Sequence, residues 1–182
     1  MRLTETTNSR FFQALCDGAK KGGRTIHNLN ETIGVLTRRE VEARLVAPLV
    51  EALEKEFGRD KVLCVIRKAV VEIARRQGQD LSRAMGGNSL RHFRDSLVHW
   101  TRDDALSLEL IEESEQAFAF NVTRCRYAEM YRDLGIAALG PILSCSRDFA
   151  LIEGFNPRIR LTRTQTLMAG APFCDFRYRL EG

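Results

Sequence analysis

The alternation of apolar and polar residues changes character about halfway along the chain. From about residue 36 to about residue 100, apolar residues recur three or four positions apart, whereas after about residue 105 they recur at every second position. The first interval is typical of amphipathic helices and the second of strands with one buried face. The pattern therefore predicts a helical first half and a strand-rich second half.

Three helices are expected in the first half. The first follows a capping box, Thr37 to Glu40, and ends at Gly58. The second runs from about Asp60 to Gln77, and Asn88 or Ser89 caps the third. The apolar stripes are Val41, Leu45, Leu49, Leu53 and Phe57 on the first helix, Val62, Ile66, Ala69, Val70 and Ile73 on the second, and Leu90, Phe93, Leu97 and Trp100 on the third.

The second half is expected to form two antiparallel hairpins with short helices between them. The first hairpin covers 106–111 and 118–122, the helices cover 126–134 and 141–153, and the last hairpin pairs Arg158–Thr166 with Phe173–Leu180. This order of elements along the chain favours a layered fold, in which helices pack on one face of an antiparallel sheet. The predicted fold class is α+β, with an N-terminal helical layer packed on a C-terminal antiparallel sheet that has short inserted helices.

Length and composition favour one domain. The chain has 182 residues, of which 44% are hydrophobic, which suffices for a core. Residues 36–182 are expected to form a single hydrolase-like domain, and residues 1–35, which are glycine-containing and weakly periodic, a leader or association segment. A role of the leader in association leaves two alternatives: a homo-oligomer, or an accessory subunit that acts with another protein.

Charge and cysteine content indicate which partners and which cellular compartment to expect. The net charge of +4 comes from basic and acidic residues that alternate, which argues against a nucleic-acid partner. No apolar stretch is long enough to span a membrane, and the polar N-terminus lacks the apolar core of a secretory signal. Five cysteines without regular spacing are typical of reduced thiols. The predicted location is the cytoplasm.

Three cysteine–carboxylate pairs in the second half are the candidate chemistry. They are Cys125 with Glu129, Cys145 with Asp148, and Cys174 with Asp175. The first two spacings place both partners on one helical face. Adjacent residues on a strand point to opposite faces, so the third pair meets only if a bulge intervenes.

A structural role for these cysteines is the competing interpretation, because free cysteine often packs as a small hydrophobe. Cys16 and Cys64 are assigned to that role. A neighbouring carboxylate also raises a thiol pKa, which disfavours a ready-made thiolate. Two arrangements reconcile thiol and acid: the carboxylate acts as a general base, or a divalent metal binds both groups. No zinc-binding spacing is present, so whether a metal binds is left open.

The stretch from Asn121 to Tyr178 resembles a known family. It contains Thr123-Arg124-Cys125-Arg126-Tyr127-Ala128-Glu129, Ser144-Cys145-Ser146-Arg147-Asp148, Gly154-Phe155-Asn156-Pro157, Thr162-Arg163-Thr164 and Cys174-Asp175-Phe176-Arg177-Tyr178. In this order the motifs are similar to the C-terminal signature of the L-2-amino-thiazoline-4-carboxylic acid hydrolase family. The resemblance covers about a third of the chain.

The resemblance implies hydrolytic opening of a cyclic isothiourea, a small molecule that carries a carboxylate. The chemistry needs an activated attacker, an acid for the leaving group and an arginine for the carboxylate. The resulting hypothesis assigns these roles: Cys145 or Cys174 as nucleophile or metal ligand, Asp148 and Asp175 as acid/base groups, Arg177 or Arg163 as carboxylate partner, and Cys125 and Glu129 as second choices. It requires the segments near residues 125, 145 and 174 to line one cavity. A non-catalytic small-molecule or metal-binding module is the alternative function.

Overall fold

Helices and strands occupy the halves of the chain that the periodicity indicates. The structure is a computed structural model that describes residues 33–182. Its elements are α3 (Val35–Phe57), α4 (Arg59–Ala84), α5 (Leu90–Ser96), α6 (Val98–Thr101), η2 (Arg102–Asp104), β1 (Leu106–Glu113), β2 (Ala117–Cys125), α7 (Arg126–Asp133), η3 (Ala137–Leu139), η4 (Pro141–Cys145), α8 (Arg147–Phe155), β3 (Ile159–Thr162), η5 (Leu167–Ala169) and β4 (Cys174–Leu180). This confirms the α+β class and both predicted hairpins.

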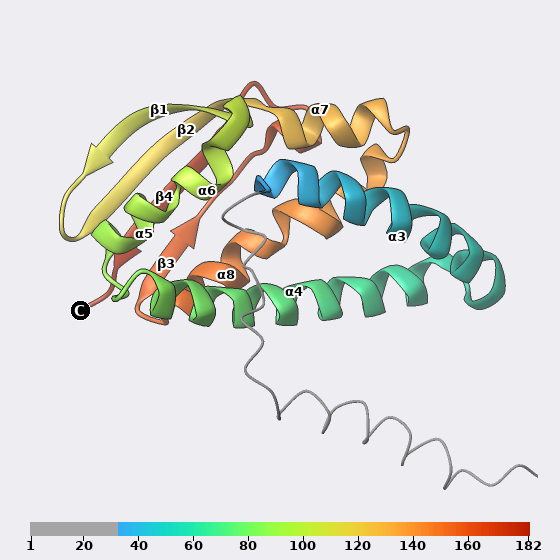
Figure 1. The fold of residues 1–182 in the computed structure, drawn as a ribbon, viewed down its shortest axis with the longest axis horizontal. Helices are drawn as coiled ribbons and strands as arrows, with labels where there is room; N and C mark the ends of the chain where they lie inside the picture. Colours follow the sequence, from blue (N-terminus) through green and yellow to red (C-terminus); the bar gives the residue numbers. More distant parts are fainter. Residues whose placement is uncertain (1–32) are drawn as a thin grey trace, which may run out of the picture.

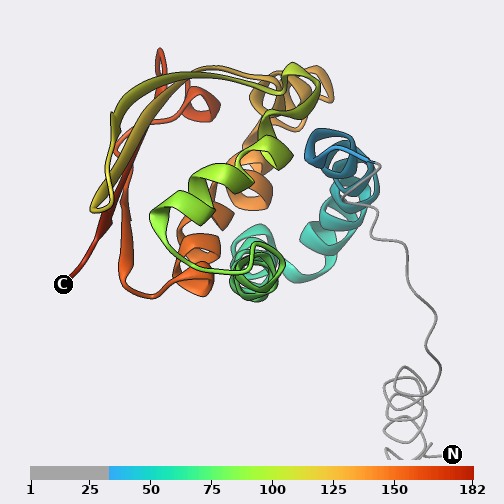
Figure 2. The same cartoon turned by 60° about the vertical axis from the view of Figure 1, so that its left-hand side comes forward.

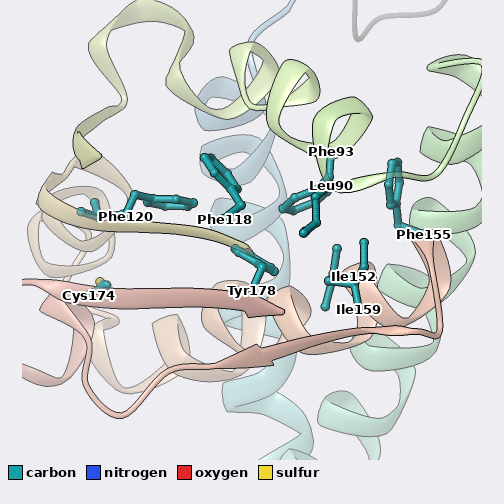
Figure 3. Packing of buried hydrophobic residues seen from close by; sticks show 10 residues of the cluster. Leu90, Phe93, Phe118, Phe120, Ile152, Phe155, Ile159, Cys174 and Tyr178 are labelled. Carbon is teal, nitrogen blue, oxygen red and sulfur yellow. The ribbon is translucent and has the colours of Figure 1, made fainter. Parts of the chain in front are cut away.

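The strands form one antiparallel sheet in the order β1-β2-β4-β3 (Figure 1). In the central pair, Phe120 lies opposite Phe176 and Val122 lies opposite Cys174. Alternate residues of these strands turn one apolar face towards α5 and α8. Figure 3 shows Phe93 of α5 and Phe155 of α8 close to this face of the sheet, where the main core lies.

Helix α3 lies in a second layer, beyond the helices that are next to the sheet (Figure 2). In Figure 2, α5, α6 and α8, coloured green and orange, lie between the sheet and the blue helix α3. The predicted second helix ends seven residues later than expected, because α4 continues through Gly78 to Ala84. Gly78 does not interrupt α4, since it is buried where α4 packs against α8. Close contact between these two helices offsets the local free-energy cost of a glycine inside a helix.

The predicted start of the first helix is wrong. Helix α3 begins at Val35, two residues before the proposed capping box, and Gly34 precedes it without a side-chain cap. Thr37 is exposed within the first turn. Glu40 instead accepts hydrogen bonds from Arg44, four residues later, at 2.7 and 3.0 Å. Gly58 ends the helix as expected, with a positive φ of 83°.

The predicted core face of the first helix is also wrong. The stripe that begins at Val41 and Leu45 is exposed, and Leu45 retains 65% of its surface. The buried face is composed of Val35, Arg39, Ala43 and Val50. Ala43 and Val50 of this face belong to a core cluster with Val62 and Val70 of α4. An apolar stripe therefore stays on the outside of α3 in the described part of the chain.

The remaining elements agree with the sequence with two interruptions. The Ser89 Oγ accepts a hydrogen bond from the His92 N–H at 3.3 Å, which confirms the predicted cap, but Leu97 separates the expected helix into α5 and α6. The expected helix 141–153 is likewise divided into the π-helical turn η4 and α8, with Ser146 between them. Cys145 and Asp148 therefore lie on either side of a junction.

Two further sequence-based expectations concern the leader and the lack of a membrane-spanning segment. Most of the proposed leader, and Cys16 with it, lies outside residues 33–182. Within those residues, the structure contains no helix with the length and apolar character that a membrane crossing requires.

Candidate active site

The ion pair between Asp148 and Arg163 is the centre of the candidate site. Asp148 lies in the first turn of α8, and Arg163 directly follows β3. Arg163 Nη1 bonds Asp148 Oδ2, and its Nη2 donates to the Cys145 carbonyl at 3.1 Å. The guanidinium also lies 5.2 Å from the ring centre of Phe149 and 5.0 Å from that of Phe176. Arg163 is therefore fixed and almost fully buried.

Asp148 borders a small apolar pocket of about 70 Å³ between the sheet and helices α5, α6 and α8. Among the described residues that line it, Asp148 is the one charged side chain; the others are Phe93, Leu97, Trp100, Leu106, Leu108, Phe120, Val122, Leu151, Phe176 and Tyr178. One third of the Asp148 side chain is accessible, and the residue is among those that line this pocket. The carboxylate is thus available to a bound molecule in apolar surroundings.

Burial raises the pKa of Asp148, while the adjacent charge of Arg163 opposes this rise. For Arg163, burial alone would lower the pKa, but the charges of Asp148 and Cys145 raise it overall. The two directions are compatible, because the ion pair exists once Asp148 has lost its proton. A carboxyl with a raised pKa beside an apolar pocket is suited to accept and return a proton.

Three thiols lie near this pair, but none of them lines the Asp148 pocket, so the single cavity that the sequence hypothesis required is not seen among the described residues. Burial raises the pKa of Cys145 to about 12, and the charge of Asp148 contributes. Burial raises the pKa of Cys125 to about 11, and that of Cys174 also lies above its usual value. Cys125, Cys145 and Cys174 each lie close enough to Asp148 to be affected by its charge. The segments near 125, 145 and 174 therefore converge, and their thiols are protonated at neutral pH.

Asp175 and Arg177 lie apart from this cluster. They follow Cys174 on β4, and Cys174 faces the core, so Asp175 and Arg177 alternate towards the opposite face of the sheet. Asp175 accepts hydrogen bonds from the Thr164 N–H at 3.0 Å and the Gln165 N–H at 2.8 Å, which fix the loop after β3. These bonds help to lower its pKa against the effect of burial.

Arg177 has a structural set of partners. It donates to the carbonyl groups of Phe120 at 2.9 Å and Phe176 at 3.0 Å, and to Asn121 Oδ1 at 2.8 Å. These bonds join β2 to β4. With Arg163 engaged by Asp148, neither arginine that we expected to hold a substrate carboxylate offers a free pair of terminal nitrogens.

Cys125 and Glu129 do not form a pair either. Glu129 accepts hydrogen bonds from Arg124 at 2.8 and 3.0 Å near the surface, and the hydrogen bond from Arg124 is the main cause of its lowered pKa. Cys125 ends β2 beside the buried core. The strand-to-helix junction at Cys125 separates two side chains that helical spacing had placed on one face.

Sequence reasoning missed the buried arginines of the helical layer. Arg39 and Arg147 each retain only 9% of their surface. Arg147 donates to the Leu143 carbonyl at 2.8 Å and to Gln77 Oε1 at 3.1 Å, and burial lowers its pKa to about 10. A usable signal existed for Arg39, because it lies four residues from both Val35 and Ala43 and so shares their helical face.

A metal-dependent site lacks a ligand set in the part of the chain that the structure describes. No three His, Cys, Asp or Glu side chains among residues 33–182 lie close enough together to hold an ion. Zinc sites ordinarily need three or four such ligands. The residues of the cluster therefore do not fit a bound divalent metal.

The thiols should differ sharply in reactivity. Cys64, which we expected to be buried, is exposed, whereas Cys174 is buried and Cys125 and Cys145 are partly buried. In a Cys16→Ser background, iodoacetamide should label Cys64 at least about 100-fold faster than Cys145 at about pH 8, because few Cys145 thiols are ionised. Peptide mass spectrometry measures the rates, with unfolded protein as the control. Equal rates for Cys64 and Cys145 in the folded chain would contradict the described burial.

Comparison with known proteins gives a matching family and several distant structural likenesses, two of which are described below. The sequence matches the L-2-amino-thiazoline-4-carboxylic acid hydrolase family over residues 38–178. No curated protein matches the sequence. A trafficking protein particle complex subunit 3 from Naegleria fowleri, covalently bound to palmitic acid, is 12% identical with a TM-score of 0.49, over 80% of this chain and 96% of that one.

The phenol-responsive sensory domain of the transcription activator PoxR, solved with phenol, is 10% identical with a TM-score of 0.49, over 75% of this chain and 73% of that one. Likenesses at this level do not bear on what the chain binds. The family match is of another kind, because it spans most of the chain and includes the whole Asp148–Arg163 cluster. The chain belongs to the L-2-amino-thiazoline-4-carboxylic acid hydrolase family.

Proposed function

We propose that the chain hydrolyses the ring of a small cyclic isothiourea that carries a carboxylate, such as 2-aminothiazoline-4-carboxylate. Membership of the hydrolase family supports the reaction class. The observation that carries the proposal is the Asp148 carboxylate, which borders an apolar pocket and is fixed by Arg163. A positioned carboxylate with a raised pKa is the group that such a hydrolysis requires.

The proposed reaction consumes one water. Asp148 takes one proton from that water as the oxygen bonds to C2, the ring carbon between sulfur and nitrogen. The electron pair of the carbon–nitrogen double bond moves onto the nitrogen, which ends with the second proton of the water as the oxygen becomes a carbonyl. The C2–sulfur bond then breaks, and the sulfur leaves with the bonding electrons and receives the proton from Asp148. The product is an open-chain N-carbamoyl cysteine, in which the water oxygen has become the carbamoyl oxygen and the ring sulfur has become a thiol.

The other residues of the cluster have supporting roles in this scheme. Arg163 holds Asp148 in place and stabilises its charged form. Cys145 and Cys174 are neutral thiols beside the carboxylate, because burial raises the pKa of each. Water is therefore favoured over a thiolate as the attacking group.

Release of free thiol is the direct test of this function. Purified full-length chain should open 2-aminothiazoline-4-carboxylate and release one thiol per ring, measured with a thiol reagent against a blank of protein alone. Hydantoin and lactam rings, which contain no ring sulfur, serve as a panel and are followed by chromatography. Absence of turnover with every ring would support the non-catalytic binding module instead. With turnover established, Cys145→Ala and Cys174→Ala should each retain activity within about tenfold; a far larger loss would transfer the attack to that thiol.

A further inference from the structure

A larger hollow lies on the other side of Trp100 from the Asp148 pocket. It has a volume of about 530 Å³ between α3, α4 and α6, within the range of small-molecule sites. It is lined by Val35, Arg38, Arg39, Gln77, Asp80, Leu81, Ala84, Met85, His99 and Trp100. Trp100 also lines the Asp148 pocket, so the two spaces share a wall.

Arg38, which lines the hollow, has one nitrogen without a hydrogen-bond partner in the described part of the chain. Arg38 Nε is buried and has no hydrogen-bond partner among residues 33–182. Burial lowers the pKa of Arg38, and the adjacent charge of Arg39 lowers it further. A buried donor without a partner is costly, so such a group marks a place where an acceptor belongs.

The carboxylates near the hollow are already engaged. Asp80 lines it but forms an ion pair with Arg83. Glu42 pairs with Arg39 and also lies 3.7 Å from Arg147. Glu42, whose charge also acts on Arg38, is thus shared with Arg39 and Arg147, and an anionic ligand would supply the acceptor that Arg38 Nε lacks among the described residues.

We infer that this hollow binds the carboxylate of a small organic anion through Arg38, with Arg39 beside it and the ring of the ligand against Trp100. The apolar side chains of Val35, Leu81 and Met85 suit the ring, and the guanidinium suits a planar carboxylate. That the ligand is the substrate rests on the proposed function.

The chain provides its own reporter for this site, because Trp100 is its single tryptophan. Thiazolidine-4-carboxylate, which has the ring and carboxylate but no amidine carbon, should change the Trp100 fluorescence in a saturable manner. Thiazolidine without the carboxylate should bind at least about tenfold more weakly. Equal affinity for both compounds, or no change with either up to about 10 mM, would overturn the inference.

Substitution of Arg38 locates the binding. Arg38→Gln should weaken binding of thiazolidine-4-carboxylate by about 10- to 100-fold, and Arg38→Lys should lie in between. Arg44→Gln is the matched control on the same helix: Arg44 is exposed and pairs with Glu40, so affinity should stay within about twofold. Circular dichroism checks that each variant is folded. A folded Arg38→Gln chain that binds as tightly as the unaltered chain would refute the assignment.

Binding and turnover can fail separately. If the unaltered chain opens no ring but binds the carboxylate through Arg38, the hydrolase proposal fails and the anion site stands. If rings are opened and Arg38→Gln leaves KM unchanged, the hydrolase stands and the anion site fails. Asp148→Asn should retain binding of thiazolidine-4-carboxylate, because the carboxylate contact is made on the far side of Trp100.

Discussion

Replacing Asp148 with asparagine is expected to lower kcat for ring opening by about 10²- to 10⁴-fold, the usual contribution of a positioned general base. Asparagine keeps the shape of the side chain and can still accept a hydrogen bond from Arg163, but it cannot take a proton from water. Thiol release under saturating substrate measures the change. Glu129→Gln is the matched control, because Glu129 pairs with Arg124 near the surface. Turnover by Asp148→Asn within about tenfold of the unaltered chain would exclude Asp148 as the base.

The same variant separates a catalytic from a structural role by its effect on stability. Folding raises the pKa of Asp148, so the folded state favours the protonated carboxyl. The stability from this preference is fully present below the unfolded pKa, about 3.9, and is lost as pH rises through the higher folded pKa. Asparagine does not titrate. Denaturant unfolding should therefore show Asp148→Asn gaining stability relative to the unaltered chain as pH rises from about 4 through the raised folded pKa of Asp148.

A relative loss over that interval would mean that the ion pair with Arg163 dominates over burial. Asp148 would then be a structural carboxylate, and its substitution would impair activity only through folding. Activity should also decline when pH falls through the pKa of Asp148, because a protonated carboxyl cannot take a proton from water. That pKa lies above the pKa of an ordinary carboxyl. The pH profile of kcat in the unaltered chain measures that decline.

Local signals predicted the strands well because apolar residues recur at every second position, although Leu108 and Leu110 of β1 are exposed. Phe118 and Phe120 face the core, as their spacing indicated, and the strands around Cys174 pair where the sequence placed them. The cap at Ser89 was also readable, because the interaction involves residues only three apart. Such features depend on neighbours in sequence, so no knowledge of the tertiary arrangement was needed.

The helical layer was harder because α3 offers two candidate faces. The larger side chains, such as Leu45 and Leu49, suggested the buried face, yet they are exposed. The face that contains Ala43 is buried instead, in a core cluster with residues of α4. Choosing the wrong face also concealed Arg39, and with it the hollow where Arg38 lies.

The candidate site was predictable in part for a related reason. Convergence of Cys125, Cys145 and Cys174 followed from the family motifs, and Asp148 belongs to the same cluster. The pairing of Arg163 with Asp148 joins residues 15 positions apart through a loop, and no periodicity encodes it. Strand parity, by contrast, already indicated that Asp175 would point away from Cys174.

The contact between α4 and α8 leads to the second large expected effect. A Cβ atom at Gly154 would lie 2.0 Å from the Arg75 carbonyl oxygen, and one at Gly78 would lie 2.0 Å from the Leu151 carbonyl oxygen. Each helix therefore uses a glycine to approach the backbone of the other. Alanine ordinarily stabilises a helix interior by about 1 kcal/mol over glycine, but here the backbones would have to separate.

Gly154→Ala should accordingly lower the free energy of unfolding by about 3 kcal/mol or more, at the upper end of overpacking costs. Denaturant unfolding measures the loss, and Gln79→Ala is the control, because Gln79 is exposed on α4 next to Gly78; its effect should stay within about 0.5 kcal/mol. Asp148 begins the helix that Gly154 anchors, so any folded Gly154→Ala chain should also lose turnover through displacement of α8. A variant of normal stability and activity would show that α4 and α8 are not packed as described, and the position of Asp148 against its pocket would lose its support.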